Sequence, residues 1–244
     1  FVVRNRPEDY DLRADGDPLQ STTPHAGGSA AAAEADDEPE FTPRQALATP
    51  AFWIITIAHL SSTVSIVTLS LHLVPKLTDM GQMLSGAGLV VLTYTAIALP
   101  SQFVAGFVAD RFPKQLVILV FLLLQASSMM VIAFAQNLYL VYLFAVLYGI
   151  GFGGRTPLLT AIRGEYFGRK AFATIMGLSM FPNNIAMIGA PLFAGYMFDS
   201  TGSYVVPFTA FGLLNVVGAF LILLARRPKI AGVRSENVSH HSAS

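Results

Sequence analysis

Arg155 is the strongest candidate in this chain for a chemical role, because it is the one full charge that we place inside a long apolar segment. A guanidinium inside a membrane-spanning helix costs about 2.5 to 3.5 kcal/mol on insertion scales, so such residues usually face a partner or an aqueous cavity. Its planar fork of donors suits bidentate binding of a carboxylate. We therefore expect Arg155 to bind an anion, whereas a cationic substrate would need a carboxylate there. In the alternative interpretation, the side chain extends to the cytoplasmic membrane surface.

Polar side chains near the middle of other apolar segments are further candidates. His59 could carry a coupling proton, because its charge changes near neutral pH, or it could hydrogen-bond a neighbouring helix. Pro182 frees a backbone carbonyl at membrane depth, and Asn183 and Asn184 could either satisfy that carbonyl or reach into a cavity. Tyr148 could line a path or merely pack. The candidate substrate-binding residues are Arg155, His59, Gln102, Tyr148, Asn183 and Asn184.

A glycine-rich run precedes Arg155 and formally matches the dinucleotide fingerprint Gly-x-Gly-x-x-Gly from Gly149 to Gly154. No strand precedes the run and no ribose-binding acid follows in the expected context, so it does not predict a nucleotide site. Gly149 and Gly153 instead have the small-xxx-small spacing that lets membrane helices approach closely. With Pro157 just beyond, we expect this helix to bend or loosen beside Arg155.

The signatures of an enzyme do not occur in the apolar segments. None holds a carboxylate pair, a metal-ligand cluster or a nucleophile with its base, and no GxxxxGK[ST] loop appears anywhere in the chain. The absence of cysteine excludes disulfides and thiolate metal sites. The sequence therefore predicts neither an enzyme nor an ATPase, and no cofactor or metal.

The elements that must position these residues follow from composition, since 53% of the 244 residues are hydrophobic and 12% are charged. Soluble domains carry about twice that charge. The net charge is zero, which gives no indication of a nucleic-acid partner. A helix of about 20 apolar residues crosses a hydrocarbon core. We predict six such spans at Thr49–Pro75, Leu84–Ala109, Gln115–Ala135, Leu138–Ile162, Ala171–Phe198 and Tyr204–Ala225.

The remaining parts of the chain flank this bundle, which we assign to residues 46–230. Pro, Gly, Ala, Asp and Glu dominate from Ala14 to Glu40, a composition that cannot bury enough apolar surface to fold. We therefore expect residues 1–45 to contain a disordered loop and residues 231–244 to be a C-terminal tail. Because the chain begins at Phe1, we interpret it as a fragment.

The basic residues predict the orientation, since cytoplasmic loops collect Lys and Arg. With both ends of the segment inside the cell, 13 of the 15 basic residues are cytoplasmic. Lys76 lies outside and Arg155 lies within a span. We therefore predict an integral, multi-pass protein of the plasma or inner membrane with both ends in the cytoplasm.

A short internal repeat accompanies this topology. The sequence Phe103-Val-Ala-Gly-Phe-Val-Ala-Asp110 ends the second span, and Leu192-Phe-Ala-Gly-Tyr-Met-Phe-Asp199 ends the fifth, 89 residues later. Three spans separate the two copies, so one aspartate emerges inside and the other outside. This is typical of an inverted repeat of three helices, although a match this short also arises by chance.

The segment Gly106-Phe-Val-Ala-Asp-Arg-Phe-Pro-Lys114 resembles the loop signature of the major facilitator superfamily, Gly-x-x-x-Asp-Arg-x-Gly-Arg/Lys, with Pro113 in place of the second glycine. Further segments resemble the oxalate/formate antiporter and monocarboxylate porter branch: Arg6-Pro-Glu-Asp-Tyr10, Arg163-Gly-Glu-Tyr-Phe-Gly-Arg169 and Gly189-Ala-Pro-Leu-Phe-Ala-Gly-Tyr196.

The resemblance implies an all-α polytopic membrane protein whose six transmembrane helices form the second half of a major facilitator fold, a 3+3 inverted repeat. Residues 1–45 would then be the end of the preceding helix and the central cytoplasmic loop. The partners implied are a small-molecule anion, the lipid bilayer and the missing first half, with protons as a further candidate partner. It also implies that charges at the cytoplasmic helix ends latch one face shut, a conformational gate of Asp110, Arg111, Arg163, Glu165 and Arg169.

From these observations we expect a secondary active transporter of small organic anions, mono- or dicarboxylates, that works by alternating access. Exchange and coupling to protons both stay open. The alternatives are a major facilitator transporter of another solute class, and a membrane scaffold or receptor that transports nothing. A scaffold would have no need for Arg155 in a span or for interrupted helices in repeat-related positions.

Overall fold

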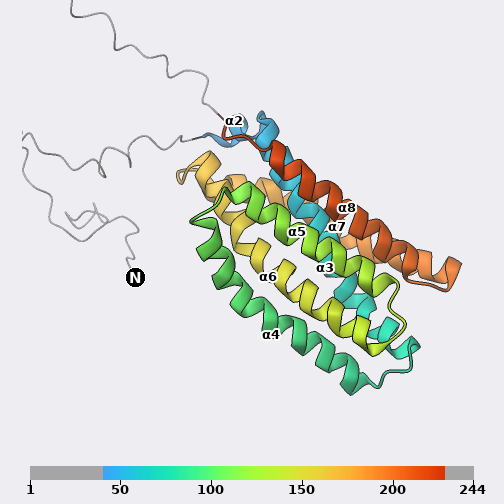
Figure 1. Ribbon diagram of the computed structural model, residues 1–244. Coiled ribbons are helices and arrows are strands. Elements are labelled where there is room, and N and C mark those ends of the chain that lie inside the picture. The colour runs from blue at the N-terminus through green and yellow to red at the C-terminus, as the bar shows by residue number, and fades with distance from the viewer. Residues whose placement is uncertain (1–40, 229–244) are drawn as a thin grey trace, which may run out of the picture. The chain divides into compact units, whose positions relative to one another are not determined.

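The computed structural model describes residues 41–228, and this part of the chain is helical (Figure 1). Most of the predicted loop (residues 1–45) and the whole predicted tail (231–244) lie outside the described residues. The elements in chain order are α2 (Pro43–Leu47), α3 (Pro50–Asp79), α4 (Leu84–Ala109), α5 (Lys114–Ala133), α6 (Leu138–Phe167), α7 (Phe172–Thr201), α8 (Val205–Leu221) and the 3₁₀ turn η2 (Ile222–Leu224).

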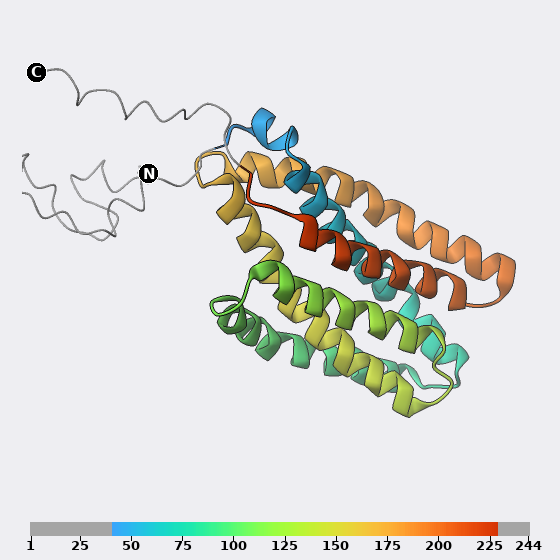
Figure 2. The same ribbon diagram turned by 45° about the horizontal axis from the view of Figure 1, so that its top comes forward.

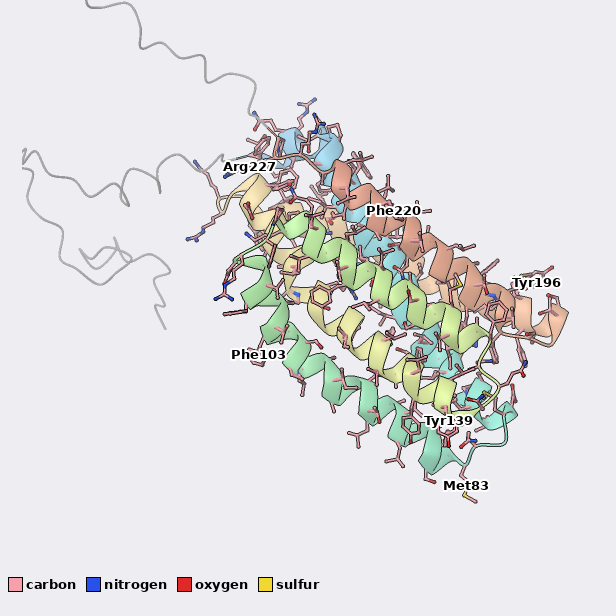
Figure 3. All side chains as sticks on the ribbon, viewed as in Figure 1. Met83, Phe103, Tyr139, Tyr196, Phe220 and Arg227 are labelled. Carbon is pink, nitrogen blue, oxygen red and sulfur yellow. The ribbon has the colours of Figure 1, made fainter. Side chains whose placement is uncertain are left out.

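Five of these helices are long and apolar enough to cross a membrane, namely α3, α4, α5, α6 and the continuous segment Val205–Leu224. α7 has 30 residues, which is long enough, but Pro182, Asn183 and Asn184 interrupt its apolar sequence. Large apolar side chains point outward from the bundle, as expected for helices surrounded by lipid (Figure 3). Examples are Met83, Phe103, Tyr139, Tyr196 and Phe220. The count of six spans stays a prediction for α7.

The predicted span boundaries hold well for α4 and less well for α3 and α6. α3 continues one turn beyond Pro75, and α6 continues beyond Ile162 to Phe167. Arg163 and Glu165, which lie beyond the predicted end of this span at Ile162, therefore belong to α6. The correction has a physical reason, because the Arg163 side chain is held by hydrogen bonds inside the bundle and the helix need not end at this charge.

The start of the described region also differs from the prediction. Residues 41–45, which we assigned to the loop, include the beginning of α2, where Thr42 and Gln45 form a capping box. Phe41 is buried, its backbone N–H donates to the carbonyl oxygen of Phe167 at 3.1 Å, and its ring meets the Phe167 ring edge-on. The segment that leads into α2 is thus tied to the end of α6.

The helices pack as two interlocked groups of three (Figure 2). α3 packs mainly against α7 and α8, whereas α6 packs mainly against α4 and α5, and α5 also packs against α8. If the repeats are α3–α5 and α6–α8, the first helix of each repeat packs against the second and third helices of the other. This exchange is consistent with the predicted three-plus-three arrangement.

Glycines of α6 set its distance to α4. A Cβ on Gly149 would lie 2.6 Å from the carbonyl oxygen of Tyr94, and a Cβ on Gly153 would lie 2.3 Å from that of Ala98. Both distances are far below van der Waals contact, so only glycine allows this approach. The prediction from the small-xxx-small spacing is confirmed.

The other glycines of the run face α5. A Cβ on Gly151 would lie 2.6 Å from the backbone nitrogen of Gln125, and a Cβ on Gly154 would lie 2.2 Å from the ring of Phe121. The glycine run therefore fits α6 between α4 and α5, which explains its composition without a nucleotide.

α3 is the polar centre of its group of helices. Its serines and threonines form buried hydrogen bonds with α5, α7 and α8, and such bonds average about 0.6 kcal/mol each between membrane helices. The pairs are Thr56 with Ser179 (3.1 Å), Thr63 with Asn183 (3.1 Å), Ser65 with Asn215 (2.8 Å) and Ser62 with Gln125.

Candidate functional site

Arg155 lies two residues beyond the close approach of Gly153 to α4, and its side chain is 2% exposed. The guanidinium carbon is 5.5 Å from the centroid of the Phe152 ring, which allows a cation–π interaction. The Nε atom is buried and has no hydrogen-bond partner within the described part of the protein. The buried position does not fit the alternative in which Arg155 extends to the membrane surface. It leaves a donor that can bind an acceptor from elsewhere.

Aromatic rings continue from Arg155 along one side of α6. Tyr148 is buried and stacks on Phe152 with ring centroids 5.7 Å apart, and on Phe144 at 5.5 Å. Tyr94 of α4 meets the Tyr148 ring edge-on at 5.1 Å. The spacing of four residues places Phe144, Tyr148 and Phe152 one above the other. This arrangement is a largely buried aromatic stack that ends beside the Arg155 guanidinium.

Arg163, which is one of the predicted gate residues, is a second buried arginine. It lies eight residues after Arg155, about two helical turns, and is 1% exposed. Nη1 donates to the carbonyl oxygen of Leu159 at 2.7 Å, and Nη2 lies 3.2 Å from Nδ1 of His59 on α3. His59 is partly exposed. The signal that we missed is the spacing of 155, 159 and 163, which places these residues on one side of a helix.

No carboxylate offsets these two charges inside the described bundle. The acidic residues between positions 41 and 228 are all exposed and lie at or near helix ends; they are Asp79, Asp110, Glu165 and Asp199. A buried charge without a partner is costly, because its desolvation is not offset by a Coulomb attraction. The arrangement is therefore electropositive in its interior, and an anion would complete it.

The other candidates are separated by their burial. Asn183 is buried, its Nδ2 donates to the carbonyl oxygen of Ser179 at 2.8 Å, and its Oδ1 accepts from Thr63. Its side chain thus binds the carbonyl next to the one that Pro182 frees, and serves helix packing. Asn184 and Gln102 are exposed on α7 and α4. The structure does not bring these residues into contact with Arg155.

The predicted gate residues lie near the ends of α4 and α6. Glu165 forms an ion pair with Lys114 at the start of α5, with both side chains partly exposed. The Arg111 guanidinium lies 3.8 Å from the centroid of the Phe107 ring. Asp110 is the exposed C-cap of α4, and Arg163 is held inside the bundle instead of at its surface. The gate role of Asp110, Arg111, Arg163, Glu165 and Arg169 stays a prediction.

Comparison with known proteins adds family relationships. A family model described as the Major Facilitator Superfamily matches residues 34–243. The chain is 26% identical over 155 residues to "Monocarboxylate transporter 13" of Rattus norvegicus, which covers 62% of this chain and 36% of that protein. It is 29% identical over 98 residues to "Multidrug resistance protein B homolog" of Mycobacterium tuberculosis strain H37Rv, which covers 40% of this chain and 18% of that protein. The chain thus spans well under half the length of these relatives.

A solved structure shows the same helical arrangement. The POT family transporter PepTSo superimposes with a TM-score of 0.64 at 20% sequence identity, over 75% of this chain and 37% of that chain. At this identity the likeness shows the fold alone.

Proposed function

The chain belongs to the major facilitator superfamily, and from that premise we propose that it forms part of a secondary carrier of small organic anions, mono- or dicarboxylates, that works by alternating access. The carrier is an integral multi-pass membrane protein. The proposal concerns the substrate class and the residues that bind it.

The observation that carries the proposal is the buried Arg155 with its unpartnered Nε donor. Because the acids at positions 41–228 are exposed, neither Arg155 nor Arg163 has a carboxylate within the described bundle. A substrate carboxylate would supply the missing negative charge, and the guanidinium can hold it by two parallel hydrogen bonds. A cationic substrate would add a third positive charge and would be repelled.

The neighbourhood of Arg155 also matches a small organic acid. The Phe152 ring lies beside the guanidinium and is partly exposed, so it offers apolar contact there. An organic carboxylate combines an apolar body with a charged end, so both parts find a partner. Among the relatives, the monocarboxylate transporter matches a longer stretch of this chain than the multidrug resistance protein.

We further propose that a first six-helix half completes the carrier. The substrate path would lie between the halves, as in transporters built from repeats whose sites lie near the bilayer midplane. The exposed side chains of Gln102 and Asn184 are candidates for this path. Both ends of the present segment would be cytoplasmic. In the proposed topology most of the basic residues lie on the same side of the membrane as these two ends, and cytoplasmic loops collect Lys and Arg.

The test is uptake into proteoliposomes that contain the complete transporter. Labelled oxalate, formate, lactate and pyruvate are offered separately, with a lipophilic cation and a neutral solute as comparisons. We expect uptake of at least one carboxylate, competition by unlabelled carboxylates and no competition by the cation. Uptake of the cation or neutral solute alone would replace the carboxylate with another solute class. Absence of all transport would favour a scaffold or receptor.

A further inference from the structure

Three arginines at one end of the bundle have no ion-pair partner in the described part of the chain. Arg44 lies on α2, and Arg226 and Arg227 follow shortly after η2. All three are exposed, and within residues 41–228 their side chains form no hydrogen bond or ion pair. α2 lies beside the end of α8 in both ribbon views (Figures 1 and 2), and Arg227 is labelled at this end (Figure 3). The three charges therefore gather where the first and last helices of the described bundle meet.

Hydrogen bonds fix the place where Arg226 and Arg227 leave the bundle. The carbonyl oxygen of Ala225 accepts from the Tyr166 hydroxyl of α6 at 2.9 Å and from Nε2 of Gln115 on α5 at 3.4 Å. Gln115 also donates to the hydroxyl oxygen of Tyr166. The backbone before the two arginines is thus held by two helices, so both side chains start from a defined position.

Arg44 is held by a separate set of contacts. A capping box closes the start of α2, and the indole N–H of Trp53 on α3 donates to the carbonyl oxygen of Leu47 at the end of α2 at 3.0 Å. Trp53 is 47% exposed, close to the start of a membrane-spanning helix, a position typical of the aromatic belt at a membrane surface. Because this ring is bonded to α2, we place α2 and Arg44 at the depth of the lipid headgroups.

No acid within the described residues offsets these charges. Asp79 and Asp199 lie near the other ends of α3 and α7. Glu165 is paired with Lys114, and Asp110 is the C-cap of α4. The three arginines therefore form a positive surface without a counter-charge in the described bundle. We call Arg44, Arg226 and Arg227 the arginine surface.

We propose that the arginine surface binds the headgroup of an anionic phospholipid in the leaflet at this end of the bundle, which is the cytoplasmic leaflet in the proposed topology. Guanidinium groups bind phosphate oxygens by parallel hydrogen bonds. Leu224, two residues before Arg226, is 64% exposed, and Trp53 is exposed beside α2. A lipid would therefore find apolar side chains for its acyl chains next to the charges for its headgroup. The inference does not depend on the substrate class.

A bound headgroup would join α2 to the segment after η2. The residue before α2 is in turn tied to α6, because the backbone N–H of Phe41 donates to the carbonyl oxygen of Phe167 at 3.1 Å and the two rings meet edge-on. The lipid would therefore connect the start and the end of the described bundle with the end of α6. Binding to the folded state stabilises it by mass action, so the midpoint of thermal unfolding should rise with lipid concentration.

The experiment measures thermal unfolding of the complete transporter in neutral detergent with increasing dioctanoyl phosphatidylglycerol. Each protein is compared with its own midpoint without lipid, so the rise gives an apparent lipid affinity even for a variant of lower stability. We expect dioctanoyl phosphatidylcholine, which has no net charge, to raise the midpoint clearly less. Equal effects of the two lipids would overturn the inference. So would an equal effect of glycerol phosphate, which carries the anionic charge without acyl chains.

Variants separate the arginine surface from a general effect of charge. An arginine near an anionic membrane surface contributes about fivefold in affinity, so Arg44→Gln should weaken phosphatidylglycerol binding about fivefold and Arg226→Gln/Arg227→Gln about 25-fold. The matched control is Lys76→Gln, near the other end of α3, which removes one positive charge and should keep the native affinity. Native affinity in both arginine variants would overturn the inference, and so would an equal loss in Lys76→Gln and Arg44→Gln.

Discussion

Gly153 of α6 and Ala98 of α4 approach so closely that a Cβ on the glycine would lie 2.3 Å from the alanine carbonyl oxygen. The distance between α6 and α4 thus depends on the absence of a side chain at position 153. Arg155 follows two residues later and is also buried, but on another side of α6, because two residues turn a helix by about 200°.

Gly153→Ala should lower the midpoint of thermal unfolding in detergent, because the new methyl group collides with the backbone of α4 and the helices must separate. Overpacking of this kind costs about 1 to 3 kcal/mol. The control is Gly177→Ala on α7, where a Cβ meets nothing within 4 Å. Equal midpoints for the two variants would contradict the packing described here.

Asn183 and Asn184 should differ sharply although they are neighbours. Asn183→Leu removes two buried hydrogen bonds and should cost about 1 kcal/mol of stability, in the range measured between membrane helices. Asn184→Leu should leave stability unchanged because its side chain is exposed. Thermal unfolding of both variants checks this, and an equal loss would show that Asn184 is also a packing residue.

The long helices could be predicted from the sequence because apolar length is a local property, and α4 begins and ends where its apolar run does. The close approach of α6 to α4 at Gly149 and Gly153 could also be predicted, because the spacing of the small residues indicates it. Asn183 and Asn184 look alike in sequence, however, and only the packing of α7 on α3 separates them.

Arg163 shows why the site itself was harder to predict. A charge after an apolar run normally marks the end of a span, and we interpreted it so. Its place inside the bundle depends on an acceptor on α3, His59, which lies 104 residues earlier in the chain. Pairings over such distances are not encoded in the local pattern.

The ion pair between Lys114 and Glu165 should contribute little to stability. The side chains are 32% and 40% exposed, and pairs of this kind contribute about 0 to 1 kcal/mol. A double-mutant cycle with Lys114→Met and Glu165→Gln should give a coupling free energy in that range, and it should shrink at high salt. A coupling above about 2 kcal/mol would require a more enclosed pair than the structure shows.

Asp110 is the member of the predicted gate whose role is easiest to isolate. If its charge helps to hold the outward-open state, Asp110→Ala should increase the accessibility of the cytoplasmic side. The chain contains no cysteine, so single cysteines introduced at either face report accessibility by thiol labelling without background from this segment. Asp199→Ala is the control at the repeat-related position. Unchanged labelling together with unchanged turnover would remove Asp110 from the gate.

The central claim is that Arg155 binds the carboxylate of the substrate, and its most direct test is carboxylate uptake by Arg155→Lys and Arg155→Ala in correctly inserted transporter. Both variants should lose at least about tenfold in uptake, because lysine keeps the charge but not the bidentate fork, and alanine keeps neither. Lys76→Ala, near the outer end of α3, should transport as the native protein does. Full uptake in both Arg155 variants would contradict the account and leave Arg155 a structural residue.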